Sequence, residues 1–277
     1  KIYDNTQIFN YFKKNKLLLL FLIEQKILEV NEDIVSLMKT NKKADKFNYL
    51  TYFYNETKPF LKPKTLEKKI EKNLSKFESN DIEKLRKCGE NEQNICQLIR
   101  EDKIEEFITF VSRNDLPLST KIKPSIFETN LFLIDKEPSL IEYSAFFGSI
   151  QIFKYLSLNG EPLTPSLWLF AIHGNNPEVI HFLEEKNIIP ENESLYKKIL
   201  NESIKCHHIE ITEYIKTNYD HFNNDDYSES FKSFNFIFFP ENLLNESSFF
   251  YLCKYNYLPF VELIINSKDL DINKKTI

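Results

Sequence analysis

Two histidines stand eight residues apart in the stretch "AIHGNNPEVIHFL" (171–183), one on each side of an Asn-Asn-Pro break. Histidine titrates near neutral pH and is the commonest protein ligand for metal ions. His173 and His181 could therefore serve a catalytic or metal-binding loop. The competing interpretation is that the stretch is one copy of a repeated unit, in which each histidine has a structural place.

A second group with metal-ligand chemistry is Cys206-His207-His208. Zinc and copper sites need cysteine and histidine ligands that converge on one point. Consecutive side chains at a turn point in different directions. We therefore expect no metal site from these three residues.

Asp225, Asp226 and Glu229 could offer oxygen ligands to calcium. Their spacing lacks the Asp-x-Asp-x-Asp-Gly order of a calcium-binding loop, which favours a solvated acidic loop. The sequence also lacks a glycine-rich phosphate loop, a His-Glu-x-x-His pair and a nucleophile elbow. We expect no catalytic residues, no bound metal and no cofactor.

The composition favours a mostly helical protein in a reducing compartment. Only four of the 277 residues are glycine, whereas nucleotide loops, tight hairpins and bulged sheets depend on glycine. The four cysteines match neither a Cys-x-x-Cys knuckle nor a disulfide framework, so we expect reduced thiols and a cytoplasmic location. The longest apolar run, residues 17–23, is far shorter than the roughly 18 residues of a membrane span and is expected to form a buried helix.

Charge is unevenly distributed along the chain. Residues 1–80 carry 16 lysines and 10 acidic residues, a net charge of +6, so the −5 of the whole chain leaves −11 for residues 81–277. An acidic surface repels phosphate backbones. We therefore expect no nucleic acid partner.

Three other stretches align with residues 171–183. They are "SAFFGSIQIFKYL" from residue 144, "SIKCHHIEITEYI" from residue 203 and "LCKYNYLPFVELI" from residue 252. Positions seven, nine, ten, twelve and thirteen of this unit are apolar almost throughout, and position eleven is polar. That spacing predicts a helix with one buried face, present four times.

The fifth position of the unit holds Gly148, Asn175, His207 and Asn256. These residue types accept the left-handed backbone that ends one helix and turns into the next. Each unit is therefore predicted to be a helix, a tight turn and a returning helix, closed in the first two copies by Gly160 and Asn187. His173 then lies on a first helix and His181 on the solvent side of a second helix, so the two should point to opposite sides of the repeat.

The order small-small-x-x-Gly-x-apolar-x-apolar-apolar-polar-apolar-apolar resembles the ankyrin repeat. The clearest copy is "SLIEYSAFFGSIQIFKYLSLNG" (139–160). The resemblance implies an all-α fold, an α-solenoid of degenerate ankyrin-type helix-turn-helix repeats, in which each pair covers its apolar face by stacking on its neighbours. The stretch "LIINSKDLDIN" (263–273) resembles the end of a unit and the approach to the next hairpin, so we expect the array to be cut off at Ile277.

The repeats depart from the ankyrin family in two ways. The family's Thr-Pro-Leu-His opening is missing, and the first copy has Ser139-Leu140-Ile141-Glu142 there. The units start 27, 32 and 49 residues apart, at 144, 171, 203 and 252, against about 33 residues in the family. The long third interval predicts an insertion at residues 220–242.

The front of the chain shows helical periodicity without a clean repeat. The stretches "ICQLIREDKIEEFITFV" (95–111) and "PSLWLFAIHGNNPEVIHFLEE" (165–185) resemble ankyrin proteins of parasitic flagellated protists, which carry a helical domain of unknown function ahead of the repeats or merged with them. We predict an irregular helical region at residues 1–90 and a repeat array at 91–277. The clearest units should lie at about 138–160, 165–187, 197–219 and 246–273.

Apolar spacing and proline positions predict the helices of this front region. The expected helices cover residues 5–28, 31–40, 44–56 and 64–87, a pair within 94–113 that turns at Asp102, and a short helix at 124–134.

In the ankyrin family the variable columns of the first helix face the concave side of the stack. The matching columns here are rich in aromatic residues, whose large rigid rings suit binding surfaces. The predicted partner-binding strip consists of Tyr143, Phe146, Phe147, Phe170, His173, Glu202, Lys205, Tyr251, Lys254 and Tyr255. The alternative is that the array curls, or that the amino-terminal helices fill the groove, and the rings are buried within the chain.

Together these patterns favour a non-catalytic protein-protein interaction module, an adapter or scaffold with a protein partner. A second interpretation is a structural component of a large cytoplasmic or cytoskeletal assembly, in which the basic front and the acidic rear contact different neighbours. A third, an enzyme or metal protein, requires a bound metal or a pocket of converging polar groups.

Overall fold

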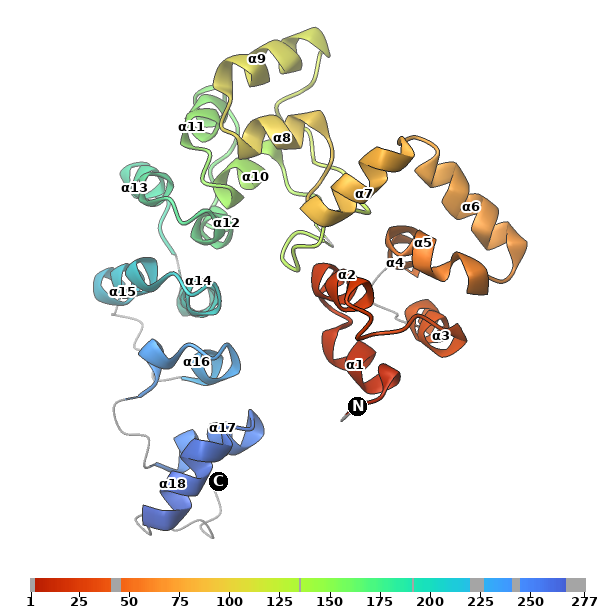
Figure 1. Ribbon diagram of the computed structural model, residues 1–277. Helices are drawn as coiled ribbons and strands as arrows, with labels where there is room; N and C mark the ends of the chain where they lie inside the picture. The colour runs from red at the N-terminus through yellow and green to blue at the C-terminus, as the bar shows by residue number, and fades with distance from the viewer. Residues whose placement is uncertain are drawn as a thin grey trace. The chain divides into compact units, whose positions relative to one another are not determined.

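A computed structural model describes residues 3–40, 46–134, 136–190, 192–219, 227–240 and 245–267 (Figure 1). Within these ranges every regular element is a helix, and an isolated bridge between Lys121 and Ser139 is the sole β-type contact. The prediction of an all-α protein is confirmed.

Contacts divide the chain into two compact units. Unit 1 comprises Lys1–Leu98 and Thr120–Ser139, and unit 2 comprises Ile99–Ser119 and Leu140–Ile277. This division differs from the predicted boundary at residue 90, because helix α8 (Asn94–Arg100) crosses from one unit to the other and residues 120–139 return to unit 1.

Unit 1 is built from short helices. They are α1 (Asn5–Phe12), α2 (Lys16–Glu24), α3 (Glu32–Thr40), α4 (Lys46–Tyr52), α5 (Tyr54–Thr57), η1 (Lys58–Phe60), α6 (Lys64–Leu74) and α7 (Ser79–Cys88). The predicted helix 5–28 is two helices, because the side chain of Asn15 accepts a hydrogen bond from the backbone N–H of Leu18 and starts α2 anew. The predicted helices 44–56 and 64–87 are likewise interrupted, after Tyr52 and after Leu74.

The core of unit 1 gathers apolar side chains from every helix between α1 and α6. Phe9, Leu19, Ile34 and Phe53 are all 1% exposed or less. Helix α2 is only partly the buried helix that its apolar run predicted, since Phe21 on its outer side is 52% exposed.

Residues 120–134 and 136–139 form no helix, and Ile126 and Phe127 belong to this core, so the helix predicted at 124–134 is wrong. The ammonium of Lys16, which is 2% exposed, donates to the carbonyls of Ile126 (3.2 Å) and Glu128 (3.1 Å). Phe127 is fully buried and meets Phe77 edge to face. These carbonyls are satisfied by a side chain from another element, which removes the need for helical hydrogen bonds.

Unit 2 consists of helix pairs that follow one another along the chain. After α9 (Ile104–Arg113) come α10 (Leu140–Phe146) with α11 (Ile150–Leu158), α12 (Leu167–Gly174) with α13 (Pro177–Glu185), α14 (Glu193–Lys205) with α15 (Ile209–Asn218), α16 (Ser228–Lys232) with η3 (Phe236–Phe238), and α17 (Glu246–Lys254) with α18 (Leu258–Ser267).

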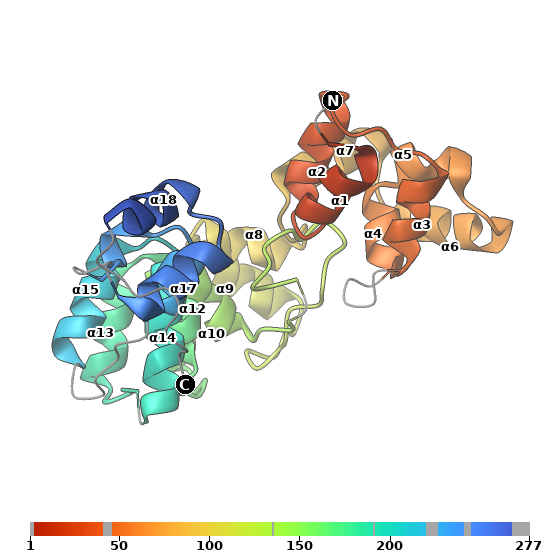
Figure 2. The same ribbon diagram turned by 90° about the horizontal axis from the view of Figure 1, so that it is seen from below.

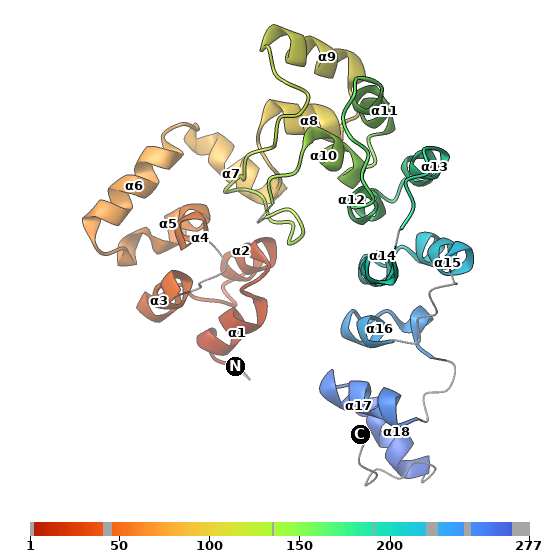
Figure 3. The same ribbon diagram turned by 180° about the vertical axis from the view of Figure 1, so that it is seen from behind.

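The first helices of these pairs form one row. α10 packs on α12, α12 on α14, α14 on α16 and α16 on α17, while α9, α11 and α13 pack on one another in a second row (Figures 1 and 3). Seen from below, α13 and α15 lie on one side of this part of the chain and α12 and α14 on the other (Figure 2). Equivalent positions of successive first helices therefore repeat across one face.

Left-handed residues connect the two helices of each pair, as predicted. The backbone φ is 67° at Gly148, 47° at Asn175, 58° at His207 and 60° at Asn256, and it is also positive at Asp102, Gly160 and Asn187. Trp168, on the first helix α12, is fully buried.

The stretch 220–242, predicted to be an insertion, contains a further and shortened pair. α16 lies between α14 and α17, and η3 stands where other pairs have a full second helix. Residues 220–226 and 241–244, and with them Asp225 and Asp226, lie outside the described residues. Phe234 adopts a φ of 56°, which marks the turn and places Ser230 at position one of the unit.

Hydrogen bonds confirm this alignment of the shortened pair. The hydroxyl at position one donates to the carbonyl three residues earlier in Ser144, Ser203 and Ser230. At three junctions the side chain at position six donates to the backbone carbonyl at position two of the preceding pair. These bonds run from Ser149 to Ile99 (2.5 Å), from Asn235 to Ile204 (2.8 Å) and from Tyr257 to Phe231 (2.7 Å). This contact recurs at three junctions between pairs, while Asn176 at position six of the α12–α13 pair donates to the carbonyl of Gly148 instead (2.8 Å).

Candidate functional site

The ten residues of the predicted strip all lie on the row of first helices or at the turns that follow them. Tyr143 and Phe146 come from α10, Phe170 and His173 from α12, Glu202 and Lys205 from α14, and Tyr251 and Lys254 from α17, while Phe147 and Tyr255 directly follow α10 and α17.

The aromatic residues of the strip on α10 and α12 are not exposed, which corrects part of the prediction. Tyr143, Phe146 and Phe170 are 1%, 5% and 7% exposed. Arg100 donates to the Tyr143 hydroxyl at 3.0 Å and its guanidinium lies over the ring of Phe147. The alternative, burial of the rings within the chain, holds for these three residues.

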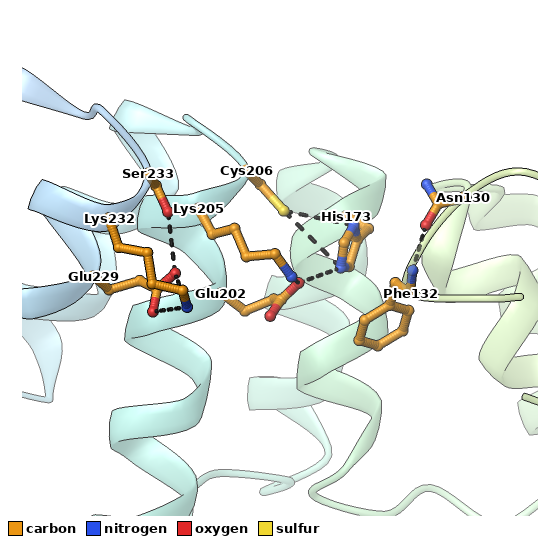
Figure 4. Close-up of polar contacts among 9 residues, drawn as sticks. All are labelled: Asn130, Phe132, His173, Glu202, Lys205, Cys206, Glu229, Lys232 and Ser233. Carbon is orange, nitrogen blue, oxygen red and sulfur yellow. Dashed lines mark hydrogen bonds and ion pairs between the residues drawn. The ribbon is translucent and has the colours of Figure 1, made fainter. Parts of the chain in front are cut away.

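His173 is the centre of the polar part of the strip (Figure 4). Its ring stacks on Phe146 with centroids 4.7 Å apart, and its Nε2 lies 2.9 Å from Oε1 of Glu202 on the next first helix. The Sγ of Cys206 lies 3.5 Å from Nδ1 and 3.9 Å from Nε2 of the same ring. One imidazole therefore joins α10, α12 and α14.

Glu202 is held as a carboxylate. Burial by itself raises its pKa, but hydrogen bonds with His173 and with Lys205 (2.8 Å) outweigh burial and lower the pKa to about 2. The carboxylate is 17% exposed and the Lys205 side chain 47% exposed, so the negative charge lies inside and the positive charge outside.

Thiol, imidazole and carboxylate suggest either a nucleophile or a metal site, since the ligand atoms of Cys206, His173 and Glu202 lie within 4.8 Å of one another. The sulfur is almost equidistant from both ring nitrogens, whereas an atom in line with one nitrogen is much farther from the other. Burial and the Glu202 charge also raise the pKa of the Cys206 thiol to about 11. As placed, the sulfur is not in line with either ring nitrogen, so this arrangement supplies no in-line pair of thiol and imidazole.

The next first helix repeats the charged part of this arrangement. In α16 the carboxylate of Glu229, 13% exposed, accepts from Lys232 at 2.9 Å and from the Ser233 hydroxyl at 3.0 Å (Figure 4). Sequence reasoning missed these residues as part of the face and placed Glu229 in an acidic loop. The signal was present, because "ESIKC" (202–206) and "ESFKS" (229–233) match position for position.

The other histidines that the structure describes have separate structural roles, while His221 lies outside the described residues. His207 forms the turn and contacts the carbonyl of Ser233 at 3.0 Å, while His208 begins α15 and burial lowers its pKa. His181 is exposed on α13, the second helix of the pair, and contacts Glu184 at 3.2 Å. The prediction that His173 and His181 lie on different helices of one pair is confirmed.

Glu184 is the shared hydrogen-bond acceptor of a second polar cluster, which lies on the second helices. It accepts hydrogen bonds from the hydroxyls of Tyr214 (2.8 Å) and Tyr219 (2.7 Å) on and after α15. Burial, together with the Glu184 carboxylate, raises the pKa of Tyr214 to about 12. The cluster ties α13 to α15 through phenols that stay protonated.

In the part of the chain that the structure describes, no helix is both long enough and apolar enough to cross a membrane. Comparison with protein-family models, with curated proteins and with solved structures yields no match for this chain.

The low pKa of Glu202 makes its contribution to stability depend on pH. Because the folded pKa is below the unfolded value, this contribution is complete above about pH 5 and is lost as the pH falls toward 2. We expect Glu202→Gln to lose at most about 2 kcal/mol at pH 7, since solvent screens part of the interaction, and much less at pH 2.5.

Urea unfolding of both proteins between pH 7 and pH 2.5 measures this difference. Glu210→Gln, at an exposed position of α15, is the control and should show a small difference at every pH. A Glu202→Gln deficit of the same size at pH 7 and pH 2.5 would contradict the assignment.

Proposed function

We propose that this chain is a non-catalytic binding protein, a degenerate ankyrin-type array that holds a protein partner on the face of its first helices. The observation that carries the proposal is the common alignment of α10, α12, α14, α16 and α17, which repeats equivalent positions across one face. Stacked repeats of this kind present extended surfaces, which suit macromolecular partners better than small substrates.

The exposed part of that face lies between α14 and α17. Lys205 and Lys254 are exposed and Tyr251 and Tyr255 are half-buried, whereas the rings of α10 and α12 are covered. We therefore assign partner binding to the α14–α17 part of the predicted strip, and a structural role to its α10–α12 part.

The cysteines support a reducing location for this binding protein. All four are free, and two of them, Cys88 and Cys253, are exposed. Exposed thiols persist in the cytoplasm, where disulfides are rare. A cytoplasmic adapter or scaffold is the form of the proposal that fits these thiols.

Site-specific photo-crosslinking in an extract of the source cells tests the proposal. A benzophenone amino acid is placed at Lys205 or Tyr255 on the face, and at Leu158, which is 79% exposed at the end of α11, as the control. We expect both face positions to form an adduct with the same protein and Leu158 to form none. Absence of an adduct from the face positions, or an equal adduct from Leu158, would reject the proposed face.

A further inference from the structure

A lysine occupies the same position on three consecutive first helices. Lys205 on α14, Lys232 on α16 and Lys254 on α17 are each at position three of their unit, and all three are exposed. The left-handed turn at Phe234 and the hydroxyl bond of Ser230 fix the alignment of the shortened pair, which places Lys232 in this row.

On α14 and α16 the lysines of the row are more exposed than the carboxylates that they contact. The Lys205 and Lys232 side chains are 47% and 57% exposed, while the carboxylates that they contact, Glu202 and Glu229, are 17% and 13% exposed. Each ammonium has three N–H donors, and these glutamates lie on its inner side. A partner approaching from solvent therefore meets ammonium groups first, and carboxylates form strong charge-assisted hydrogen bonds with such groups.

The spacing of the row favours one conformation of the partner. Packed helices lie about 8–10 Å apart. A polyproline II segment has three residues per turn and rises about 3.1 Å per residue, so every third side chain points the same way at about 9 Å intervals. A β-strand would alternate such side chains between its two faces. An acidic residue at every third position of a polyproline II segment matches the lysine row.

Aromatic rings surround the last lysine of the row. The ammonium of Lys254 lies 5.4–5.8 Å from the ring centroids of Phe250, Tyr251 and Tyr255. The two tyrosine rings are nearly parallel, with centroids 6.3 Å apart, and Phe250 is 55% exposed. Proline-rich segments dock on aromatic surfaces of this kind because their conformation is formed before binding.

From this row and these rings we infer that the partner segment is a proline-containing acidic stretch in the polyproline II conformation, with a carboxylate at every third residue. The inference rests on the proposed function and specifies the chemistry of the partner. Nucleic acid fits less well, because residues 81–277 carry a net charge of −11, which repels a polyanion beyond the lysine row.

Fluorescence anisotropy of the full chain with labelled peptides tests the inference. The probe is (Glu-Pro-Pro)3, compared with a block peptide of the same composition, with (Gln-Pro-Pro)3 and with a nine-nucleotide single-stranded DNA. We expect (Glu-Pro-Pro)3 to bind at least tenfold more tightly than each of the other three probes, and to weaken as salt is added.

Matched triple variants locate the binding on the chain. Lys205→Gln, Lys232→Gln and Lys254→Gln together should weaken binding at least tenfold, while the same three positions changed to Arg should keep it. The control combines Lys154→Gln, Lys186→Gln and Lys216→Gln, exposed lysines on or after second helices, and should stay within twofold of the native chain. Circular dichroism melting confirms that each variant is folded.

Several results would overturn the inference: no binding of (Glu-Pro-Pro)3, equal binding of the block peptide, tighter binding of the DNA, or equal weakening by the control triple. If crosslinking from Lys205 and Tyr255 succeeds while the peptide fails, the binding face stands and the partner chemistry is wrong. If crosslinking also fails, the proposed function itself is rejected.

Discussion

Replacing Arg86 by methionine is expected to destabilise unit 1 by about 3–5 kcal/mol, because it leaves a carboxylate without its charged partner in a largely buried site. Arg86 is 5% exposed on its side chain and its Nη2 lies 2.8 Å from Oε1 of Glu56. The guanidinium lies 5.5 Å from the centroid of the Tyr52 ring, and the Tyr52 hydroxyl donates to the carbonyl of Arg86 at 2.7 Å.

The same pair is incompletely satisfied. Among the described residues, Nε of Arg86 and Oε2 of Glu56 are buried without a hydrogen-bond partner. Unpaired buried polar atoms reduce what an ion pair contributes. The double variant Arg86→Met with Glu56→Met should therefore recover most of the stability that the single variant loses.

Hydrogen exchange of the amides in α4, α6 and α7 measures both effects, since Trp168, the only tryptophan, lies in unit 2 and does not report on unit 1. Lys87→Met is the control. Lys87 is 55% exposed and its contacts with Glu24 and Glu83 are both 3.4 Å, so solvent screens these ion pairs and the expected loss is small. A single variant no weaker than this control, or a double variant as weak as the single, would contradict the argument.

The turns of unit 2 were predictable because their signals are local. A left-handed residue five positions into each unit, followed by apolar residues at helical spacing, needs no knowledge of the rest of the chain. Gly148, Asn175, His207 and Asn256 all have positive φ. The shortened pair escaped prediction because its turn uses Phe234, a residue type that rarely adopts this backbone.

Burial of the aromatic strip was not predictable from any single unit. Tyr143 is covered with help from Arg100, which is 43 residues away in the sequence, and Phe146 is covered by a histidine from the next pair. Apolar spacing identifies which side of a helix is buried but does not tell how closely successive pairs approach. Lys232 of the lysine row differs in this respect, since the match between residues 202–206 and 229–233 aligns it with Lys205 within the sequence itself.

Non-local contacts also explain the errors in unit 1. The segment 124–134 was predicted to be a helix from its apolar spacing after Pro124, yet the carbonyls of Ile126 and Glu128 accept hydrogen bonds from Lys16, more than a hundred residues earlier. A lysine directly before an apolar run carries no sequence signal that it will be buried and bond to a distant loop. The helix break at Asn15 did carry a signal, since Asn is a preferred N-cap residue.

Two glycines in unit 2 allow the closest backbone approach between successive pairs, and adding a single methyl group at either should be costly. A Cβ on Gly174 would lie 2.5 Å from the carbonyl oxygen of Ala145 and 2.6 Å from the backbone nitrogen of Gly148. Both contacts are with backbone, which cannot rotate away as a side chain can. We expect Gly174→Ala to lose about 2–3 kcal/mol or more, the cost of forcing α10 and α12 apart.

Gly148 combines this close approach with a second constraint. Its φ of 67° costs a residue with a Cβ about 1–2 kcal/mol, and its added Cβ would lie 2.8 Å from the carbonyl oxygen of Gly174. Gly160 isolates the cost of the backbone conformation, because its φ is 96° and nothing lies within 4 Å of an added Cβ. The expected order of stability loss is Gly148→Ala first, then Gly174→Ala, then Gly160→Ala.

Urea unfolding followed by the fluorescence of Trp168, which is buried in α12 itself, ranks these three variants. An order led by Gly160→Ala would mean that backbone conformation, and not the contact between pairs, limits the fold. The expected order would instead show that close packing between the units starting at 144 and 171, which are only 27 residues apart, requires two glycines whose backbones are in contact. Gly174, which lies next to His173 at the end of α12, would then be required for stacking, and this agrees with a binding face farther along the row, at α14 to α17.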